Sequence, residues 1–151
     1  MKTVVAGALG ECVHVAGVLN FLHLAELAGW RTVFLGPAVP PADFIRAVER
    51  EKADLVGVSY RLTPETGERL LGEFAESADE LRQSGVRFVF GGTPPVAARA
   101  QAFSGFFEQV FDGSQPPEEV LAFLKGESIG STESISYPQV VTSRVQWKAP
   151  F

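Results

Sequence analysis

Short apolar runs and longer amphipathic segments alternate along the first 124 residues of the chain. The short runs are rich in β-branched and aromatic residues and predict strands near residues 2–8, 31–35, 54–59, 87–90 and 108–111. The longer segments carry apolar residues at helical spacing and predict helices near residues 16–28, 42–51, 64–84, 96–103 and 117–124. The alternation of the two kinds of segment predicts an α/β fold.

The predicted strands are apolar on both sides, which is typical of a parallel sheet covered by helices on both faces. Crossover connections between parallel strands are right-handed. We therefore expect a flavodoxin-like, Rossmann-type doubly wound sheet of five parallel strands in the order 2-1-3-4-5. Residues 63–65 (Thr-Pro-Glu) offer a hydroxyl cap and a proline for the start of the third helix. Gly29 and Gly85 mark helix ends, and Gly36 is expected to follow the second strand.

The character of the chain changes at residue 126. The stretch GESIGSTESISYPQ is rich in Ser, Gly and Glu and has no period that would bury a face, so we interpret it as a linker. Residues 140–151, with Trp147, are apolar enough to dock on a partner. We expect one domain over residues 1–125 and a linker or partner-docking tail over 126–151, which could also lead into a further domain.

Composition narrows the class of protein. The chain has 151 residues, 46% of them hydrophobic, which is enough for the core of one domain. Its net charge of −5 and its lack of a Lys/Arg cluster argue against nucleic acid or an anionic membrane surface as partners. The single cysteine, Cys12, excludes an internal disulfide and fits a reducing, cytoplasmic compartment.

Ligands of an open parallel sheet bind beyond the carboxyl ends of the strands. The segments at those ends are residues 10–17 (GECVHVAG), 59–63 (SYRLT) and 91–95 (GGTPP). They do not match three common occupants of the fold. The first segment lacks the G-x-G-x-x-G spacing of a dinucleotide site and the hydroxyl residues of a flavin phosphate loop. Ser59 stands where a phospho-acceptor receiver domain would need an aspartate.

The remaining candidate is a loop histidine, His14, which precedes a predicted helix and has Gly17 three residues later. On its own, a loop histidine is most simply a helix cap or a locally packed side chain. His23 lies within the predicted helix and needs no functional role.

The three segments together resemble the cobalamin (B12)-binding domain shared by B12-dependent mutases, methionine synthase and corrinoid methyl carriers. The signature of that family is D-x-H-x-x-G after the first strand, S-x-L after the third and G-G after the fourth. The chain has CVHVAG, SYR and GG at these places. The stretches LAGWRTVFLGPAVPPADFIRAV and KADLVGVS also look familial, so the resemblance covers roughly residues 2–124.

The resemblance implies roles for individual positions. His14 matches the lower axial ligand of cobalt, which replaces the cofactor's own base, and a neutral imidazole suits that role. Ser59 matches the residue that hydrogen-bonds the displaced base, and Gly91 and Gly92 match positions where the nucleotide tail passes close to the backbone. The positions implied to bind the cofactor are Glu11, Cys12, Val13, His14, Val15, Gly17, Ser59, Tyr60, Arg61, Gly91, Gly92, Thr93, Pro94 and Pro95.

Two positions depart from the family pattern. Cys12 replaces the aspartate that accepts a hydrogen bond from the ligand histidine, and a thiol is a weak acceptor. Since such partners tune a metal-bound histidine, we expect weaker or more labile ligation by His14 than in a typical member. Arg61 replaces the leucine of S-x-L, where it can turn to solvent or pair with a phosphate.

The opening KTVVAGALGECVHVAGVLNF looks particularly like the small, cobalamin-binding subunits of mutases such as glutamate mutase. The resemblance implies a component of a carbon-skeleton mutase, an isomerase, that holds adenosylcobalamin and works with a substrate-binding barrel subunit or domain. Because the chain offers no acid–base pair or nucleophile of its own, we expect the cofactor-holding component and not a self-sufficient enzyme. The alternatives are a corrinoid carrier or sensor, with methylcobalamin as the other cofactor form, and a flavodoxin-like module without B12.

Overall fold

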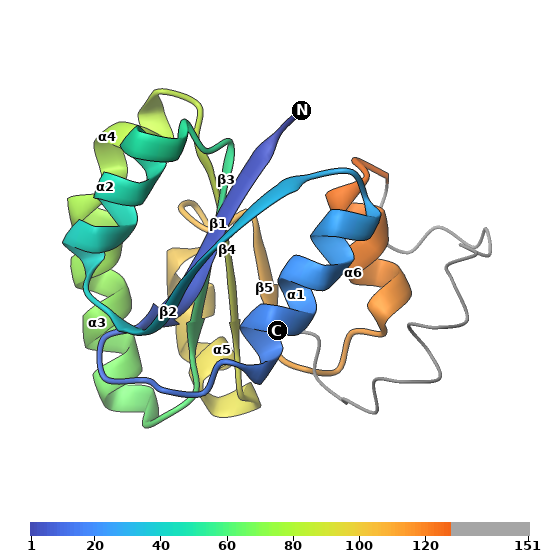
Figure 1. The fold of residues 1–151 in the computed structure, drawn as a ribbon. Helices are drawn as coiled ribbons and strands as arrows, with labels where there is room; N and C mark the ends of the chain where they lie inside the picture. Colours follow the sequence, from blue (N-terminus) through green and yellow to red (C-terminus); the bar gives the residue numbers. More distant parts are fainter. Residues whose placement is uncertain (128–151) are drawn as a thin grey trace.

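Five parallel strands form a single sheet in the computed structural model, which describes residues 1–127 (Figure 1). The strands are β1 (Thr3–Leu9), β2 (Arg31–Val39), β3 (Leu55–Tyr60), β4 (Arg87–Gly92) and β5 (Gln109–Phe111). They lie in the order β2-β1-β3-β4-β5, and every neighbouring pair is parallel. The predicted fold class and strand order are therefore confirmed.

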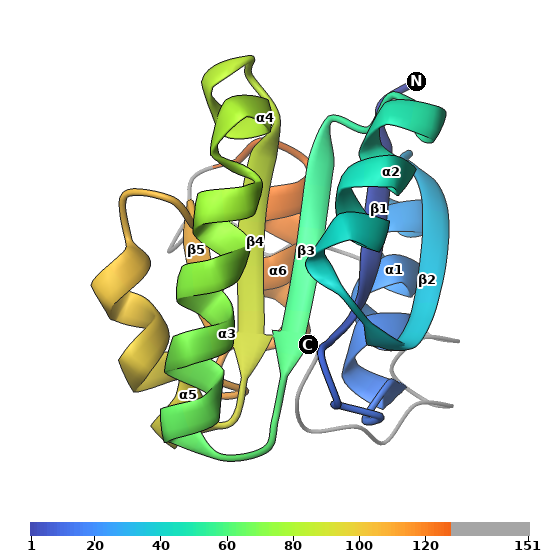
Figure 2. The ribbon, with the colours of Figure 1, turned by 90° about the vertical axis from the view of Figure 1, so that its left-hand side faces the viewer.

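Helices cover both faces of the sheet. They are α1 (Ala16–Leu27), α2 (Pro41–Glu51), α3 (Pro64–Ser77), α4 (Asp79–Gln83), α5 (Pro94–Ala100) and α6 (Pro117–Leu124), with a short 3₁₀ turn at Gln101–Phe103. Helices α1 and α6 lie on one face, and α2, α3, α4 and α5 lie on the other (Figure 2). Strands β1, β3 and β4 are almost wholly buried because they lie between these two layers.

Each face of the sheet has its own hydrophobic core. On the α1/α6 face, Val4, Leu55 and Val89 pack with Phe21 and Trp30. On the opposite face, edge-to-face phenylalanine contacts link the strands to α2 and α3, with Phe74 at their centre. Because side chains alternate along a strand, residues two apart share a face, and this assigns the strand-end residues to one layer or the other.

The third predicted helix, residues 64–84, is two helices in the structure. The backbone leaves the helical range at Ala78, whose φ is −101° and ψ is 5°. Ser77 and Asp79 flank the break and are poor residues for a helix interior, whereas the Asp79 carboxylate suits the first turn of α4. Thr63 occupies the predicted N-cap position of α3, but its hydroxyl makes no capping hydrogen bond.

The prediction that Gly36 follows the second strand is wrong, because β2 continues to Val39. Gly36 adopts a positive φ of 96° within the strand. The pairing with β1 shifts there, from Ala6 opposite Phe34 to Gly7 opposite Gly36, which is a β-bulge. Among residues 1–127 no helix is long and apolar enough to span a membrane. Most of the predicted tail, residues 128–151, lies outside the described part of the chain.

Candidate functional site

The three predicted segments meet at the carboxyl edge of the sheet. Ala8, Ser59 and Gly91 lie side by side on β1, β3 and β4, and Tyr60 lies opposite Gly92 in the next row. The loop that carries His14 leaves β1 at the same edge, immediately before α1. Parallel register therefore brings together residues that are more than 70 positions apart in the sequence, as the fold class predicts.

The His14 loop is held by the bulged end of β2. The Gly10 N–H donates to the Val39 carbonyl oxygen at 2.9 Å, and the Ala38 N–H donates to the Cys12 carbonyl oxygen at 2.9 Å. Ala38 adopts a left-handed φ of 52°, a conformation that costs a residue other than glycine about 1–3 kcal/mol. The bond to Cys12 offsets part of that cost. Ala38 is a positioning residue that sequence reasoning missed, because an alanine gives no sign of a positive φ.

His14 is exposed, and its ring is oriented by one neighbour. The Nδ1 atom lies 3.8 Å from Sγ of Cys12, whose side chain is fully buried. Helix α1 begins after Val15, which is the N-cap residue, and no side-chain hydrogen bond caps it. The interpretation of His14 as a helix cap is therefore wrong, whereas a local contact, with the Cys12 thiol, is present. His23 lies half-buried on α1.

Ser59 carries a buried hydroxyl group that has no hydrogen-bond partner among residues 1–127. Leu55, four residues earlier, belongs to the core under α1 and α6, and so does Val89, two residues before Gly91. Ser59 and Gly91 consequently face the α1/α6 layer. Buried polar groups are almost always paired in native proteins, so an unpaired one indicates a strained site or the place of a missing ligand group.

Tyr60 and Gly92 pack on the opposite face of the sheet. Tyr60 is buried in the phenylalanine-rich core, where its ring would lie 3.0 Å from a Cβ added to Gly67. A Cβ added to Gly92 would lie 2.5 Å from the Tyr60 carbonyl oxygen and 3.0 Å from the Phe90 ring. Close packing therefore explains the glycine at position 92 without any ligand.

The other predicted site residues lie around the same edge. Glu11 and Val13 are exposed in the His14 loop, Val15 and Gly17 are half-buried at the start of α1, and Arg61 is half-buried just after β3. Thr93 is the N-cap residue of α5, and its carbonyl oxygen accepts a hydrogen bond from the Ala97 N–H. Pro94 and Pro95 are exposed in the first turn of that helix.

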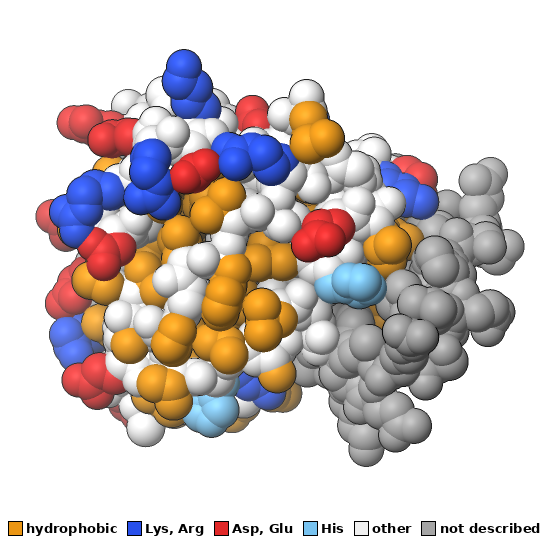
Figure 3. Space-filling view, in the orientation of Figure 1, with side chains coloured by type: hydrophobic (Ala, Val, Ile, Leu, Met, Phe, Trp, Pro, Cys, Tyr) orange, Lys and Arg blue, Asp and Glu red, His pale blue; other side chains and the backbone are white. Residues whose placement is uncertain are grey.

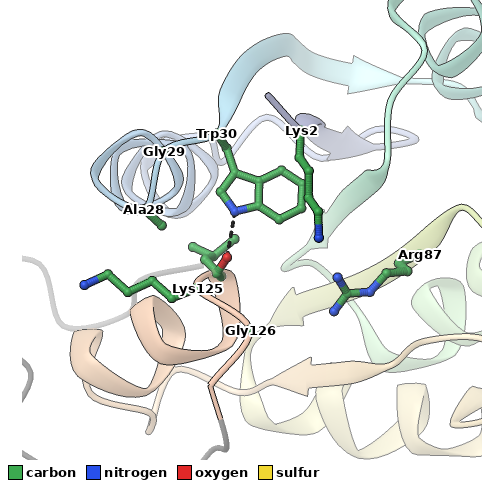
Figure 4. Close-up of a pocket in the computed structure, with 8 residues that line it drawn as sticks. Lys2, Ala28, Gly29, Trp30, Arg87, Lys125 and Gly126 are labelled. Atoms are coloured by element: carbon green, nitrogen blue, oxygen red, sulfur yellow. Dashed lines mark hydrogen bonds between the residues drawn. The ribbon is translucent and has the colours of Figure 1, made fainter.

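An open pocket of about 280 Å³ lies at the opposite, amino edge of the sheet (Figure 4). Its Trp30 indole N–H donates to the Leu124 carbonyl oxygen at 2.7 Å, and Lys2 lies 5.7 Å from the centre of the indole ring. Hydrogen bonding to Glu108 raises the pKa of Arg87, another lining residue. Cations at this edge complement the carboxyl ends of α1 and α6, so we assign the cluster a structural role.

Of the titratable groups with clear pKa shifts, Asp112 directly follows β5 at the carboxyl edge, where Phe111 pairs with Gly91, whereas Glu51 and Arg87 lie at the opposite edge. The Ser114 hydroxyl donates to the Asp112 carboxylate and lowers its pKa, and hydrogen bonds from Arg50 and Arg31 lower the pKa of Glu51. Within residues 1–127, no group of three His, Cys, Asp or Glu side chains could hold a metal ion. His14 therefore stands as a single candidate ligand.

The described fold is a Rossmann-like α/β domain with a histidine at the carboxyl edge of its parallel sheet. The family model of the B12 binding domain matches residues 2–125, and the chain belongs to this family. It is 30% identical over 132 residues to the glutamate mutase sigma subunit of Clostridium tetanomorphum, covering 82% of this chain and 93% of that one. It is 27% identical over 127 residues to glutamate mutase sigma subunit 1 of Haloarcula marismortui, covering 82% and 84%.

Solved structures show the same fold. A cobalamin-binding protein from Desulfitobacterium hafniense DCB-2 superimposes with a TM-score of 0.69 at 19% identity, covering 83% of this chain and 58% of that one. The methanol:cobalamin methyltransferase complex MtaBC from Methanosarcina barkeri gives a TM-score of 0.57 at 25% identity, covering 83% and 47%. The chain thus spans about half the length of these solved proteins.

Proposed function

We propose that the chain binds cobalamin in the base-off form, with His14 as the lower axial ligand of cobalt, and that it serves as the cofactor-holding component of an adenosylcobalamin-dependent mutase. The observation that carries the proposal is an exposed imidazole at the same sheet edge as a buried hydroxyl that has no hydrogen-bond partner among residues 1–127. Bound cobalamin would supply a cobalt–carbon bond that can break to give a radical.

The residues at the carboxyl edge fit this cofactor. A neutral imidazole nitrogen is a suitable cobalt ligand, and His14 is exposed at the start of α1. The buried Ser59 hydroxyl, which has no partner in the described part of the chain, would gain one by hydrogen bonding a nitrogen of the displaced base. Gly91 lies beside it on the same face and adds no side chain to that space. We therefore place the displaced nucleotide tail against these two positions, between the sheet and the α1/α6 layer.

The adenosyl form and a catalytic partner are supported by the likeness to glutamate mutase sigma subunits, since a sigma subunit is one component of its enzyme. Two large apolar side chains are exposed at the carboxyl edge, Val13 at 62% and Leu62 at 39%. Figure 3 shows that hydrophobic side chains also gather over the edge strand β2. We propose that a substrate-binding barrel subunit or domain covers the carboxyl edge when the cofactor is bound.

The test is the visible spectrum of hydroxocobalamin mixed with the purified protein. We expect the base-off, histidine-on spectrum with the wild-type protein and its loss with His14→Ala. His23→Ala, which changes the other histidine of the chain, is the matched control and should leave the spectrum unchanged. A spectrum identical to that of the free cofactor would refute cobalamin binding, and an unaltered spectrum with His14→Ala would refute the assignment of the ligand.

A corrinoid carrier of methyl groups is the second candidate, favoured by the likeness to the methanol:cobalamin methyltransferase complex. The two functions differ in the cofactor and in the partner. Stabilisation of adenosylcobalamin over methylcobalamin, with a barrel subunit as the co-purifying protein, supports the mutase. A preference for methylcobalamin and a co-purifying methyltransferase would support the carrier.

A further inference from the structure

Cys12 is fixed against the ring of His14 by its own backbone. Its N–H donates to the Leu9 carbonyl oxygen at 3.1 Å, and its carbonyl oxygen accepts a hydrogen bond from the Ala38 N–H at 2.9 Å. The free thiol is completely buried, and its Sγ lies 3.8 Å from Nδ1 of His14. Nδ1 is therefore engaged by the protein, and Nε2, on the other side of the exposed ring, is the nitrogen available to a ligand.

The proton of the neutral imidazole ring can lie on either nitrogen, and each position gives a different contact with the thiol. The thiol can donate its S–H to a bare Nδ1, in which case the neutral ring carries its proton on Nε2. Alternatively, Nδ1–H can donate to sulfur, which leaves the Nε2 lone pair free. Sulfur is a weak acceptor and a bare imidazole nitrogen is a good one, so the first arrangement is favoured. A nitrogen that carries a proton has no lone pair to offer a metal.

We propose that Cys12 is a positioning residue that holds His14 in the tautomer with the proton on Nε2, and so opposes ligation of cobalt by that nitrogen. The inference rests on the proposed function. For His14 to ligate, the proton must leave Nε2 and a proton must occupy Nδ1, which turns the favourable S–H···N contact into a weak N–H···S contact. A carboxylate at position 12 accepts hydrogen bonds only and would favour the ligating tautomer instead.

If Cys12 opposes ligation, its variants should rank differently in affinity for cobalamin than if Cys12 were a weak acceptor that helps ligation. Cys12→Asp should raise the affinity for cobalamin with His14 ligated by about tenfold or more, the size of effect usual for partners of metal-bound histidines. Cys12→Ala removes the opposing donor and should also bind more tightly than the wild type. If Cys12 instead helps ligation as an acceptor, Cys12→Ala binds more weakly. Cys12→Ser retains a donor of similar size and should stay near the wild type.

The first measurement is made on the protein without cofactor. Two-bond ¹H–¹⁵N NMR correlations at about pH 8, where an imidazole is neutral, report the protonated nitrogen of each histidine. We expect His14 to be protonated on Nε2 in the wild type and to shift towards Nδ1 in Cys12→Asp, while His23 is the same in both. A wild-type His14 with its proton on Nδ1 would overturn the proposal.

The second measurement is the affinity for hydroxocobalamin, read from the histidine-on absorbance, with urea unfolding to verify that each variant folds. Tighter binding by the folded Ala and Asp variants supports the proposal, and weaker binding by the Ala variant would overturn it. Each variant is repeated with His14→Ala, which should abolish the histidine-on signal in every background. A signal that survives His14→Ala would refute the proposed function and leave the NMR result on the tautomer intact.

Discussion

Replacing Ser59 with alanine should stabilise the cofactor-free protein. The Ser59 hydroxyl is fully buried and has no hydrogen-bond partner among the described residues, and a buried unsatisfied polar group costs about 1–3 kcal/mol. Alanine removes one oxygen atom and leaves only a small void on the sheet, so most of this cost should be recovered. We expect the free energy of unfolding to rise by about 1 kcal/mol and Tm by about 2–4 °C.

The same substitution should weaken cobalamin binding. If the Ser59 hydroxyl bonds the displaced base, its loss removes one hydrogen bond of about 0.5–1.5 kcal/mol, which is roughly 2- to 12-fold in Kd. Opposite effects on stability and on affinity would identify a hydroxyl group that is retained for a ligand, since a structural hydroxyl would lower stability when removed.

The assay is urea unfolding of the cofactor-free protein, followed by titration with hydroxocobalamin. Thr3→Val is the matched control, because Thr3 is also buried but its Oγ1 accepts a hydrogen bond from Arg31 Nε at 3.1 Å. The control should lose about 0.5–1.5 kcal/mol. If Ser59→Ala lowers the free energy of unfolding as Thr3→Val does, the Ser59 hydroxyl has a partner in the folded chain. The argument that this hydroxyl destabilises the cofactor-free protein would then be wrong.

Three further substitutions test other parts of the structure. Gly92→Ala should lower the free energy of unfolding in urea by about 1–3 kcal/mol, because the added methyl group meets backbone. Gly105→Ala, with open space around its Cβ, is the control and should change it by less than about 0.5 kcal/mol. Equal values for the two variants would contradict the packing argument. Trp30→Phe removes the hydrogen bond to the Leu124 carbonyl oxygen and should lower stability by about 1–3 kcal/mol, so an unchanged Tm would show that this bond contributes nothing. The pKa of Asp112 is lowered in the folded protein, so its ionised carboxylate stabilises the fold at pH values above the usual carboxyl range. This stabilisation is lost as the pH falls through the folded-state pKa. The wild type should therefore unfold at higher urea than Asp112→Asn at about pH 7, and the difference should shrink below about pH 4; a difference that grew in acid would refute this sign.

The sequence by itself was sufficient for the architecture and for the location of the candidate site. Strand and helix periods are local properties of the chain, so they predicted a doubly wound parallel sheet, and the rule that strand ends meet at one edge placed residues 10–17, 59–63 and 91–95 together. The helix at Pro117–Leu124 matches its predicted bounds, and α1 begins at the predicted Ala16. The motif also singled out Ser59, whose hydroxyl lacks a partner within the described part of the chain and is the strongest structural sign of a ligand.

The tertiary structure decided which atoms of these segments meet. The left-handed Ala38 and the register of the bulge at Gly36 accompany the hydrogen bonds between β2 and the His14 loop, and an alanine gives no sign in advance of a positive φ. The contact of Cys12 with Nδ1 of His14 depends on how that loop is pinned. Tyr60 and Ser59 are adjacent in sequence but face opposite layers, since a strand alternates its side chains. Hydrophobic periodicity specifies which face is buried, whereas hydrogen-bond partners and side-chain contacts depend on segments brought together only by folding.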